Sequence, residues 1–432
     1  MASLKIKNAR VIQHDNELTQ TDVVIRDGKI TEMAPKLMVK TDRVIDAHGQ
    51  LLMPGLIDVH VHFREPGFEY KETIATGSKA AARGGFTTVL AMPNLNPVPS
   101  TVEAFKQVQA LNQANGVINV EQYAAISDGL TSETVDDMQA LAQAGAIAFT
   151  NDGKGVQSAK TMRDAMAAAK EVNRPLVAHV EDESLVDGGV MNLGARSAEL
   201  ELPGMDPLGE SAQLARDLVI AKATGVHYHV AHISTKESVE LVRIAKQQGV
   251  DVTAEVSPHH LLLDENDIDG DNALFKMNPP LRTSEDRTAV VAGLLDGTLD
   301  MVATDHAPHA VEEKERSFVG AAFGITGIET SFQLLYTHLV RSGIATVEQL
   351  EQWMVKNPAQ AFNLDAPTAV AVGQKADLAL FDIDHAHTIT ADEFVSKGVN
   401  SPFIGATIYG QTSMTLMDGE IVYTAAPSVV NE

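Results

Sequence analysis

Eight short runs rich in apolar and β-branched residues recur along the chain, and segments with helical periodicity separate them. The intervening segments, such as 101–113 and 234–248, repeat apolar residues at the spacing of one helix face. Eight strands alternating with helices predict a (β/α)8 TIM barrel, with a doubly wound sheet as the main alternative. The eight predicted strands are 51–62, 85–93, 118–126, 145–152, 174–182, 227–234, 251–258 and 300–308.

The two ends of the chain have a different pattern from the middle. Residues 1–52 and 365–432 hold short alternating runs, with DGK at 27–29 and DGE at 418–420. An Asp-Gly pair between alternating runs is typical of a tight β-hairpin. We therefore expect both ends to pack together as one small flanking β-sandwich domain, beside a barrel formed by residues 53–364.

Charge and cysteine content exclude several classes of protein and of site. The 432 residues carry a net charge of −25, which argues against nucleic acid or an anionic membrane as partner. The chain has no cysteine, so disulfides, thiolate metal sites and cysteine nucleophiles are excluded. The N-terminal residues lack the apolar core of a signal peptide, and no run of 18 apolar residues occurs. We expect a cytoplasmic protein.

Residue types that bind metal ions stand at the ends of five predicted strands. A lone histidine on a strand is more often a buried structural residue. That interpretation requires a separate coincidence at each of the five strand ends, whereas one metal site explains them together. Histidines two apart on a strand share a face, and the C-terminal ends of barrel strands converge on one mouth. Four imidazoles and two carboxylates there predict a binuclear Zn²⁺ site. The six residues are His60, His62, Asp152, His179, His232 and Asp305.

Longer motifs that include these residues resemble those of the class I bacterial dihydroorotases of the amidohydrolase superfamily. They cover nearly the whole chain in the order found in that family. The resemblance implies a (β/α)8 barrel with a flanking β-domain. It also implies reversible cyclisation of N-carbamoyl-L-aspartate to L-dihydroorotate and water in de novo pyrimidine (UMP) biosynthesis. The motifs are DVHVHFREPG (58–67), AMPN (91–94), FTNDG (149–153), VAHVED (177–182), HYHVAHISTKES (227–238), KMNPPLR (276–282) and ATDHAPH (303–309).

The resemblance also implies a role for each candidate site residue. It implies two Zn²⁺ ions per subunit bridged by Asp152, with His60 and His62 as the first ligand pair and His179 and His232 on the second ion. Asp305 touches the first ion and transfers the proton. The substrate contacts implied are His62, Arg64, Asn94, Asn278, His309, Phe323 and Gly324. From the residues alone, Arg64 could equally form a salt bridge to Glu65 or Glu69.

One position departs from the pattern of many amidohydrolases, which bridge their metals with a carboxylated lysine on the fourth strand. Here Phe149 and Thr150 stand in that region, and the next lysine is Lys154, past the predicted strand end. The resemblance therefore favours the aspartate bridge. The segment 309–324 is long enough to act as a lid over the mouth, with an ordinary surface loop as the alternative.

Two other functions remain open at this point. The chain could be another cyclic amidase, such as an allantoinase, a hydantoinase or a dihydropyrimidinase; Arg64 and the missing lysine argue against the last two. It could also be a non-catalytic scaffold, but such relatives tend to lose ligands that are all present here. The family suggests a homodimer. Association with aspartate carbamoyltransferase occurs in some relatives, but nothing in the sequence identifies such an interface.

Overall fold

Parallel strands form a closed barrel in the computed structural model, which describes residues 3–12 and 17–425. Neighbouring strands pair in parallel around the ring. Val61 bridges His306 in parallel, and His62 N donates to His306 O at 2.9 Å, which joins the last strand to the first. The barrel prediction is confirmed, and closure excludes the doubly wound sheet. The strands are β6 (Leu56–Val61), β7 (Phe86–Ala91), β8 (Asn119–Gln122) continued by β9 (Ala124–Ala125), β10 (Phe149–Thr150), β11 (Leu176–Ala178), β14 (Tyr228–Val230), β15 (Val252–Val256) and β16 (Met301–Val302).

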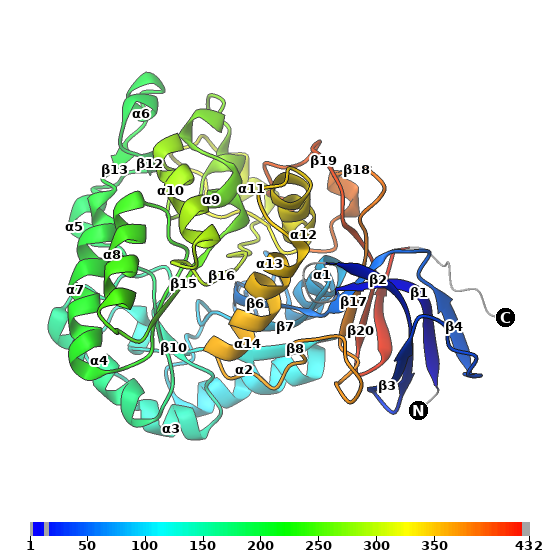
Figure 1. The fold of residues 1–432 in the computed structure, drawn as a ribbon. Helices are drawn as coiled ribbons and strands as arrows, with labels where there is room; N and C mark the ends of the chain where they lie inside the picture. The colour runs from blue at the N-terminus through cyan, green and yellow to red at the C-terminus, as the bar shows by residue number, and fades with distance from the viewer. Residues whose placement is uncertain (1–2, 13–16, 426–432) are drawn as a thin grey trace.

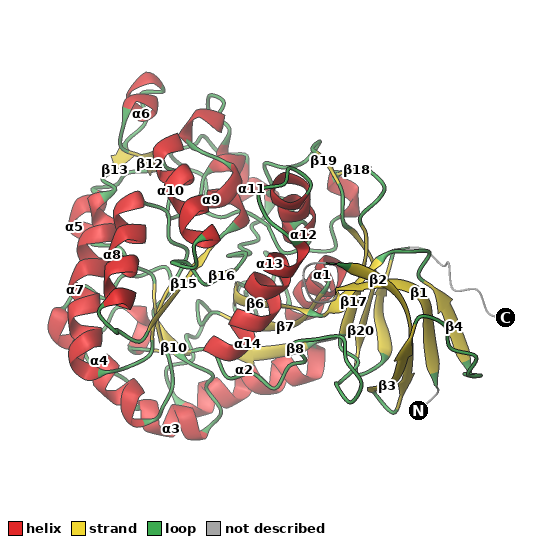
Figure 2. Cartoon of the chain, viewed as in Figure 1, coloured by secondary structure: helices red, strands yellow, loops and turns green. Residues whose placement is uncertain are grey.

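Helices surround these strands on the outside (Figure 2). Several begin at a Thr or Ser whose side chain accepts from a backbone N–H of the first turn, as Thr101, Ser158 and Thr235 do. After β16 the chain continues through short helical segments rather than one long helix. The helices are α1 (Ile74–Gly84), α2 (Val102–Asn115), α3 (Met138–Gln143), α4 (Ala159–Glu171), α7 (Leu208–Thr224), α8 (Lys236–Gln247), α10 (Ser284–Leu295), α12 (Ser331–Leu335), η5 (Tyr336–Val340), α13 (Val347–Glu351), η6 (Gln352–Lys356) and α14 (Asn357–Ala361).

Additional short elements follow the C-terminal ends of the barrel strands. Those after β11, β15 and β16 lie at the upper end of the barrel in Figure 1. Because they stand where parallel strands end, they form the walls around the barrel mouth. They are η2 (Asp128–Leu130), α5 (Glu183–Val186), β12 (Met191–Asn192), α6 (Ala195–Glu199), β13 (Gly204–Met205), α9 (Pro258–Leu262), η3 (Glu265–Asp267), η4 (Ala273–Phe275) and α11 (Val311–Lys314).

Strands from both ends of the chain form a second, eight-stranded sheet (Figure 1). Its order is β21-β20-β17-β5-β1-β2-β3, with β4 also paired to β1. Asn8 adopts φ 59° within β1. β1 pairs β4 before this residue and β5 after it, so the sheet divides at Asn8. The strands of this sheet have an apolar core of their own. The strands are β1 (Leu4–Ile12), β2 (Leu18–Arg26), β3 (Lys29–Ala34), β4 (Arg43–Asp46), β5 (Leu51–Pro54), β17 (Leu378–Asp382), β20 (Gln411–Met417) and β21 (Glu420–Thr424). The nearby pair β18 (His387–Thr388) and β19 (Thr407–Ile408) and the turn η7 (Ala391–Glu393) complete this region.

Both predicted hairpins of this sheet are present. Asp27 and Gly28 join β2 to β3 with φ of 49° and 73°, and Asp418 and Gly419 join β20 to β21 with φ of 50° and 78°. Two successive positive φ values are what a type I′ turn requires, and Asp-Gly supplies them at low cost. The two turns touch, since a Cβ added to Gly28 would lie 3.0 Å from Asp418 O.

The run 51–62, predicted as one strand, is divided between the two sheets, so that prediction is wrong. β5 pairs β1 and β17 up to Pro54, and β6 begins the barrel at Leu56. Gly55 lies between them, and its N–H donates to Asp377 O at 2.8 Å. A Cβ at Gly55 would lie 2.1 Å from Thr87 Oγ1. The chain changes sheets at Gly55, the one residue of this run that has no side chain, three residues past the boundary expected at 52.

Replacing this glycine tests the close approach. Gly55→Ala should lower the free energy of unfolding by about 1–3 kcal/mol, because the methyl group overlaps Thr87 in a packed interior. The midpoint of urea unfolding measures the change. Gly209→Ala is the matched control, since its Cβ would meet its nearest atom at 3.5 Å in helix α7. Equal stability of Gly55→Ala and wild type would show that Thr87 turns away freely.

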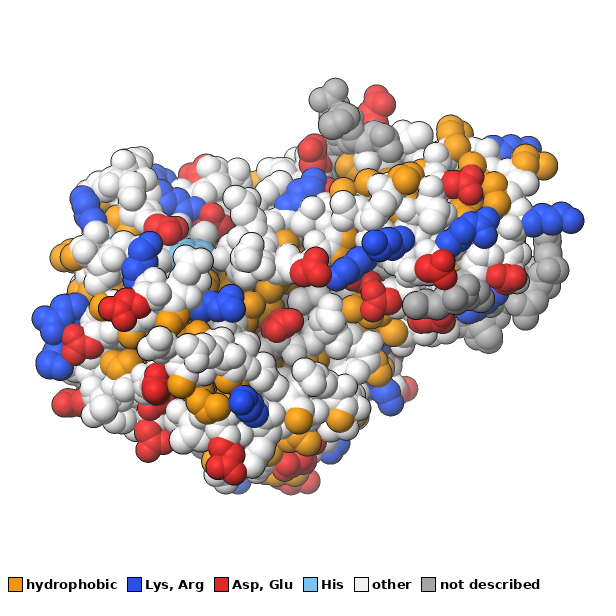
Figure 3. All heavy atoms as spheres, turned by 90° about the horizontal axis from the view of Figure 1, so that it is seen from below, with side chains coloured by type: hydrophobic (Ala, Val, Ile, Leu, Met, Phe, Trp, Pro, Cys, Tyr) orange, Lys and Arg blue, Asp and Glu red, His pale blue; other side chains and the backbone are white. Residues whose placement is uncertain are grey.

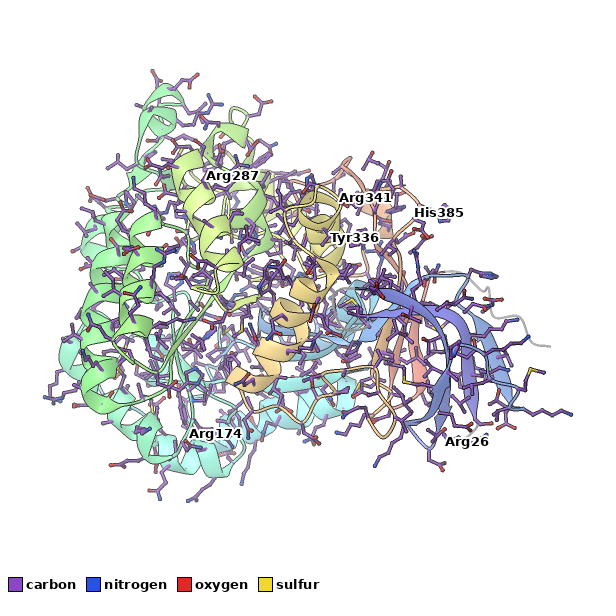
Figure 4. All side chains as sticks on the ribbon, in the orientation of Figure 1. Arg26, Arg174, Arg287, Tyr336, Arg341 and His385 are labelled. Carbon is purple, nitrogen blue, oxygen red and sulfur yellow. The ribbon has the colours of Figure 1, made fainter. Side chains whose placement is uncertain are left out.

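Aromatic contacts join the barrel to the sheet of the two ends. The Phe332 ring of α12 stacks on Phe381 of β17 with centroids 3.8 Å apart. Arg341 lies with its guanidinium carbon 3.6 Å from the Tyr409 ring centroid, and Figure 4 shows Tyr336 and Arg341 on the helical segment that faces this sheet.

On the surface seen from below, acidic and basic side chains are interspersed among polar and apolar ones (Figure 3). Within residues 3–12 and 17–425, no helix combines the length and apolarity needed to cross a bilayer.

Candidate active site

The six residues expected to bind metal meet at the mouth of the barrel. His60 lies on β6, and the others follow the ends of β6, β10, β11, β14 and β16 within three residues. All six are buried. Because the C-terminal ends of parallel barrel strands converge, side chains up to 245 positions apart in sequence form one cluster. Three overlapping groups place their ligand atoms within 4.8 Å of one another: His60, His232 and Asp305; His60, His62 and Asp152; and Asp152, His179 and His232.

Asp152 lies at the centre of this cluster. Its Oδ1 is 3.4 Å from His60 Nε2, 3.5 Å from His232 Nε2 and 3.8 Å from His179 Nδ1. Its Oδ2 is 3.5 Å from His62 Nε2. One carboxylate therefore faces both histidine pairs, which is the arrangement that a bridging ligand requires.

Asp305 lies on the side of the first pair. Its Oδ1 is 3.0 Å from His62 Nε2 and 3.4 Å from His60 Nε2. Burial by itself raises the pKa of Asp305, but the charge of His60 and the hydrogen bond from His62 outweigh it and hold that pKa below its usual range. Asp305 also adopts φ 47°, and His232 φ 30°. Such backbone conformations are costly for residues other than glycine and concentrate at functional sites.

The donor set of this cluster fits a divalent metal ion. His60 Nε2 and Asp152 Oδ1, which lie 3.4 Å apart, are both buried without a hydrogen-bond partner, which is unfavourable unless something else binds them. Burial by itself lowers the pKa of His60, but the surrounding carboxylates, led by Asp152, raise it well above its usual range. The cluster therefore attracts positive charge. Imidazole and carboxylate ligands suit zinc, whose tetrahedral ligands at about 2.0 Å lie about 3.3 Å apart.

Glu255 is a member of the cluster that sequence reasoning missed. It lies on β15, which provides none of the six residues, and it is fully buried. His60 Nδ1 donates to its Oε1 at 2.6 Å, and the His232 backbone N donates to the same oxygen at 3.2 Å. His229 Nε2 donates to its Oε2 at 3.0 Å. The signal was a lone glutamate in the apolar strand DVTAEVSP. His229, on the neighbouring strand β14, supports this carboxylate.

We expect Glu255 to matter for metal affinity. Glu255→Gln removes the charge that orients His60 and favours a basic Nε2, so zinc affinity should fall about 10- to 100-fold, the usual cost of losing such a partner. Competition with a chromogenic chelator measures the affinity without any assay of turnover. Glu240→Gln, on the exposed side of α8, is the control. Unchanged affinity in Glu255→Gln would limit this residue to packing.

Comparisons with known proteins agree with this geometry. Residues 49–238 match the family described as "Dihydro-orotase-like". A dihydroorotase of Pediococcus pentosaceus is 54% identical over 418 residues, which are 97% of this chain and 98% of that protein. The dihydroorotase of Ligilactobacillus salivarius is 55% identical over 426 residues, or 98% and 99%. The chain belongs to the dihydroorotase family.

Solved structures of other amidohydrolases share the fold of this dihydroorotase-family chain. An L-hydantoinase from Arthrobacter aurescens aligns with a TM-score of 0.88 at 26% identity and covers 100% of this chain and 98% of its own. A dihydropyrimidinase from Brevibacillus agri aligns with a TM-score of 0.85 at 23% identity, covering 97% and 94%. These alignments span barrel and end domain together, which agrees with the predicted fold class.

A cavity of about 220 Å³ lies over the cluster. Asn94 Nδ2 donates to Asp152 O at 2.6 Å, and Asn278 Nδ2 donates to Glu181 Oε2 at 2.7 Å. The side-chain carbonyl oxygen of each asparagine is buried without a partner, so both can accept from a ligand. Of the expected substrate contacts, the residues that line the cavity are His62, Arg64, Asn94, Asn278, Phe323 and Gly324.

His309, also expected to contact substrate, lies beside the cavity rather than in its lining. Its Nε2 donates to Phe323 O at 2.8 Å and lies 3.4 Å from Arg64 Nη2. Burial, with the charges of Arg64 and Lys71, lowers the pKa of His309 to about 3. It is therefore a neutral imidazole whose Nε2–H is taken by Phe323 O, so its approach to Arg64 is a packing contact and not a hydrogen bond.

The neighbours of Arg64 decide between its two interpretations. Its Nε donates to Pro308 O at 3.3 Å. Glu65 instead accepts from Ile74 N at 2.8 Å, and Glu69 accepts from Gly67 N at 2.9 Å. The expected alternative, a salt bridge from Arg64 to Glu65 or Glu69, is not formed. The guanidinium faces the cavity without a carboxylate from this segment.

The fourth strand carries no lysine that could reach the His/Asp cluster. β10 is Phe149–Thr150, and the Lys154 side chain is 52% exposed with its ammonium 3.7 Å from Glu183 Oε1. Asp152 therefore occupies the central position that a carboxylated lysine holds in many amidohydrolases.

Proposed function

We propose that this protein is a dihydroorotase, which interconverts N-carbamoyl-L-aspartate with L-dihydroorotate and water in pyrimidine biosynthesis. The observation that carries the proposal is the Arg64 guanidinium at the edge of a cavity floored by the His/Asp cluster. The name of the relatives at 54–55% identity supports the same reaction. The substrate has a carboxylate beside its scissile ring amide, and the site offers a matching cation beside its metal ligands.

Two zinc ions would be held by His60, His62 and Asp305 and by His179 and His232, with Asp152 between them. When bound, these ions activate water and polarise the scissile carbonyl. The distances between ligand atoms support this assignment, and so do the buried His60 Nε2 and Asp152 Oδ1, which have no hydrogen-bond partner. Metal analysis of the purified protein tests the expected stoichiometry of two.

Asp305 is the residue that we assign to proton transfer. In the hydrolytic direction its carboxylate accepts a proton from the attacking water and delivers it to the departing ring nitrogen. A single carboxylate can do both when it lies between the attacking and leaving atoms. Its pKa below the usual range supports a carboxylate that is ionised before the reaction begins.

Arg64 would bind the substrate carboxylate through two parallel hydrogen bonds. Asn94 and Asn278 would accept from substrate N–H groups through their free carbonyl oxygens. His309 would hold Arg64 in place from behind and complete the carboxylate pocket. The wall formed by Phe323 and Gly324 would close the opposite side. These contacts fix the amide over the cluster, which is a large part of the catalytic effect of an enzyme site.

A hydrolysis panel tests the assignment against other cyclic amidases. The purified protein with added Zn²⁺ is offered L-dihydroorotate, dihydrouracil, hydantoin and allantoin. Cleavage of dihydroorotate alone, abolished by a chelator and restored by Zn²⁺, is the expected result. Cleavage of a substrate without the carboxylate would favour a hydantoinase or allantoinase. Metal binding without any cleavage would favour a scaffold.

The expected assembly and location are further parts of the proposal. We propose a homodimer in the cytoplasm, on the basis of the family. Light scattering of the purified protein measures the mass. Mixing with aspartate carbamoyltransferase during the same measurement tests the association that some relatives form.

A further inference from the structure

Two buried lysines lie behind the cavity wall opposite to Arg64. Lys276 directly precedes Met277 and Asn278, which line the cavity, and Lys314 ends helix α11. The residues are only 2% and 7% exposed. Buried lysines normally pair with a carboxylate. Within residues 3–12 and 17–425, neither ammonium has an ion pair within 4.0 Å.

Backbone carbonyls of one loop take the place of the missing carboxylates. Lys314 Nζ donates to Ala322 O at 3.0 Å, to Gly324 O at 3.0 Å and to Lys276 O at 3.1 Å. All three of its N–H donors are thereby used. The Lys314 ammonium therefore ties the loop to the backbone of the segment that carries Asn278.

Lys276 binds the same loop from the other direction. Its Nζ donates to Ala321 O at 2.8 Å and to Val319 O at 3.0 Å. The ammonium also lies 4.3 Å from the Phe323 ring centroid, a cation–π contact. Burial lowers the pKa of Lys276 to about 8, and burial with the nearby charge of Lys276 lowers that of Lys314 to about 7. These directions agree with ammonium groups that are buried without a carboxylate partner.

The loop held in this way forms the cavity wall. Gly324 N donates to Lys276 O at 3.0 Å, so the wall and the Asn278 segment are joined in both directions. Gly324 has φ 146°, and a Cβ there would lie 2.8 Å from Ala307 O. The peptide after Phe323 is thus fixed between two lysines on one side and β16's extension on the other.

We propose that Lys276 and Lys314 are positioning residues that clamp 319–324 as one wall of the substrate pocket and thereby set substrate affinity. Neither ammonium lines the cavity, so both act through the backbone that they bind. The kinetic part of this inference rests on the proposed function. The structural part does not rest on the proposed function, because it concerns only whether the two lysines hold the 319–324 loop in place.

Lys314→Met tests the clamp, with Lys79→Met on the exposed face of α1 as the matched control. Methionine keeps an unbranched side chain only one atom shorter but removes all three donors. Endoproteinase Glu-C should then cleave after Glu315, an exposed residue between Lys314 and the 319–324 loop, at least tenfold faster than in wild type. KM for dihydroorotate should rise at least tenfold, while kcat stays within about threefold. Lys79→Met should change neither quantity.

Each outcome decides the matter. Wild-type cleavage and KM in folded Lys314→Met would overturn the clamp and leave the proposed function intact. Faster cleavage without turnover of dihydroorotate by the wild type would support the clamp and overturn the substrate. A fall in kcat with unchanged KM would also contradict a role in affinity. If Lys314→Met does not fold, Lys314→Gln, which keeps two donors, should raise cleavage and KM at least threefold, and wild-type values would overturn the proposal.

Discussion

Asp305→Asn should lower kcat for dihydroorotate by about 10³-fold, within the 10²–10⁴ range typical of losing a general acid–base group. Asparagine has nearly the same shape, so the fold and the contact with His62, at 3.0 Å from Oδ1 in the wild type, should survive. Its amide cannot accept the proton of an attacking water and return it to the leaving nitrogen. The substitution therefore removes proton transfer while the asparagine side chain still fills the space of the aspartate.

Steady-state kinetics and metal analysis must be combined to interpret this variant. Asp305 lies 3.4 Å from His60 Nε2, so the amide could also weaken metal binding. Activity is measured at saturating Zn²⁺, and the metal content is determined on the same sample. Asp164→Asn, on α4 and partly exposed, is the control. A kcat within a few fold of wild type at full metal occupancy would remove Asp305 from proton transfer.

Arg64→Lys should lower kcat/KM for dihydroorotate by about 100-fold, which is about 2.7 kcal/mol of transition-state stabilisation. Lysine keeps the charge but cannot form two parallel hydrogen bonds to a carboxylate. It would also lose the hydrogen bond from Nε to Pro308 O, at 3.3 Å, which orients the side chain. Arg64 adopts φ 63°, a strained backbone conformation for a residue other than glycine. This conformation accompanies a side chain that lines the cavity.

Substrate comparison shows whether the effect arises from the carboxylate. Any residual cleavage of dihydrouracil, which lacks this group, should be equal in wild type and Arg64→Lys. Arg163→Lys, an exposed arginine of α4, controls for the substitution itself. Unchanged kcat/KM for dihydroorotate in Arg64→Lys would mean that the carboxylate lies elsewhere in the cavity.

Local sequence patterns were sufficient to predict most of the fold. Each predicted barrel strand contains an observed one, because a buried parallel strand is a short apolar run that can be recognised without its neighbours. Both Asp-Gly turns were predicted because positive φ at two successive residues depends on the residues themselves. The division of 51–62 between two sheets was not predicted. Its cause is Thr87 of the next strand, whose side chain would lie 2.1 Å from a Cβ at Gly55.

The sequence by itself determined which residues stand at the strand ends, and hence the six that meet at the barrel mouth. Strand periodicity and the convergence of parallel strands are properties that a linear pattern contains. Only the tertiary structure decided what supports them. Glu255 is 195 residues from His60, and Lys276 and Lys314 bind carbonyls that every residue of a loop possesses. Backbone acceptors are identical along the chain, so only folding selects which of them a buried charge will bind.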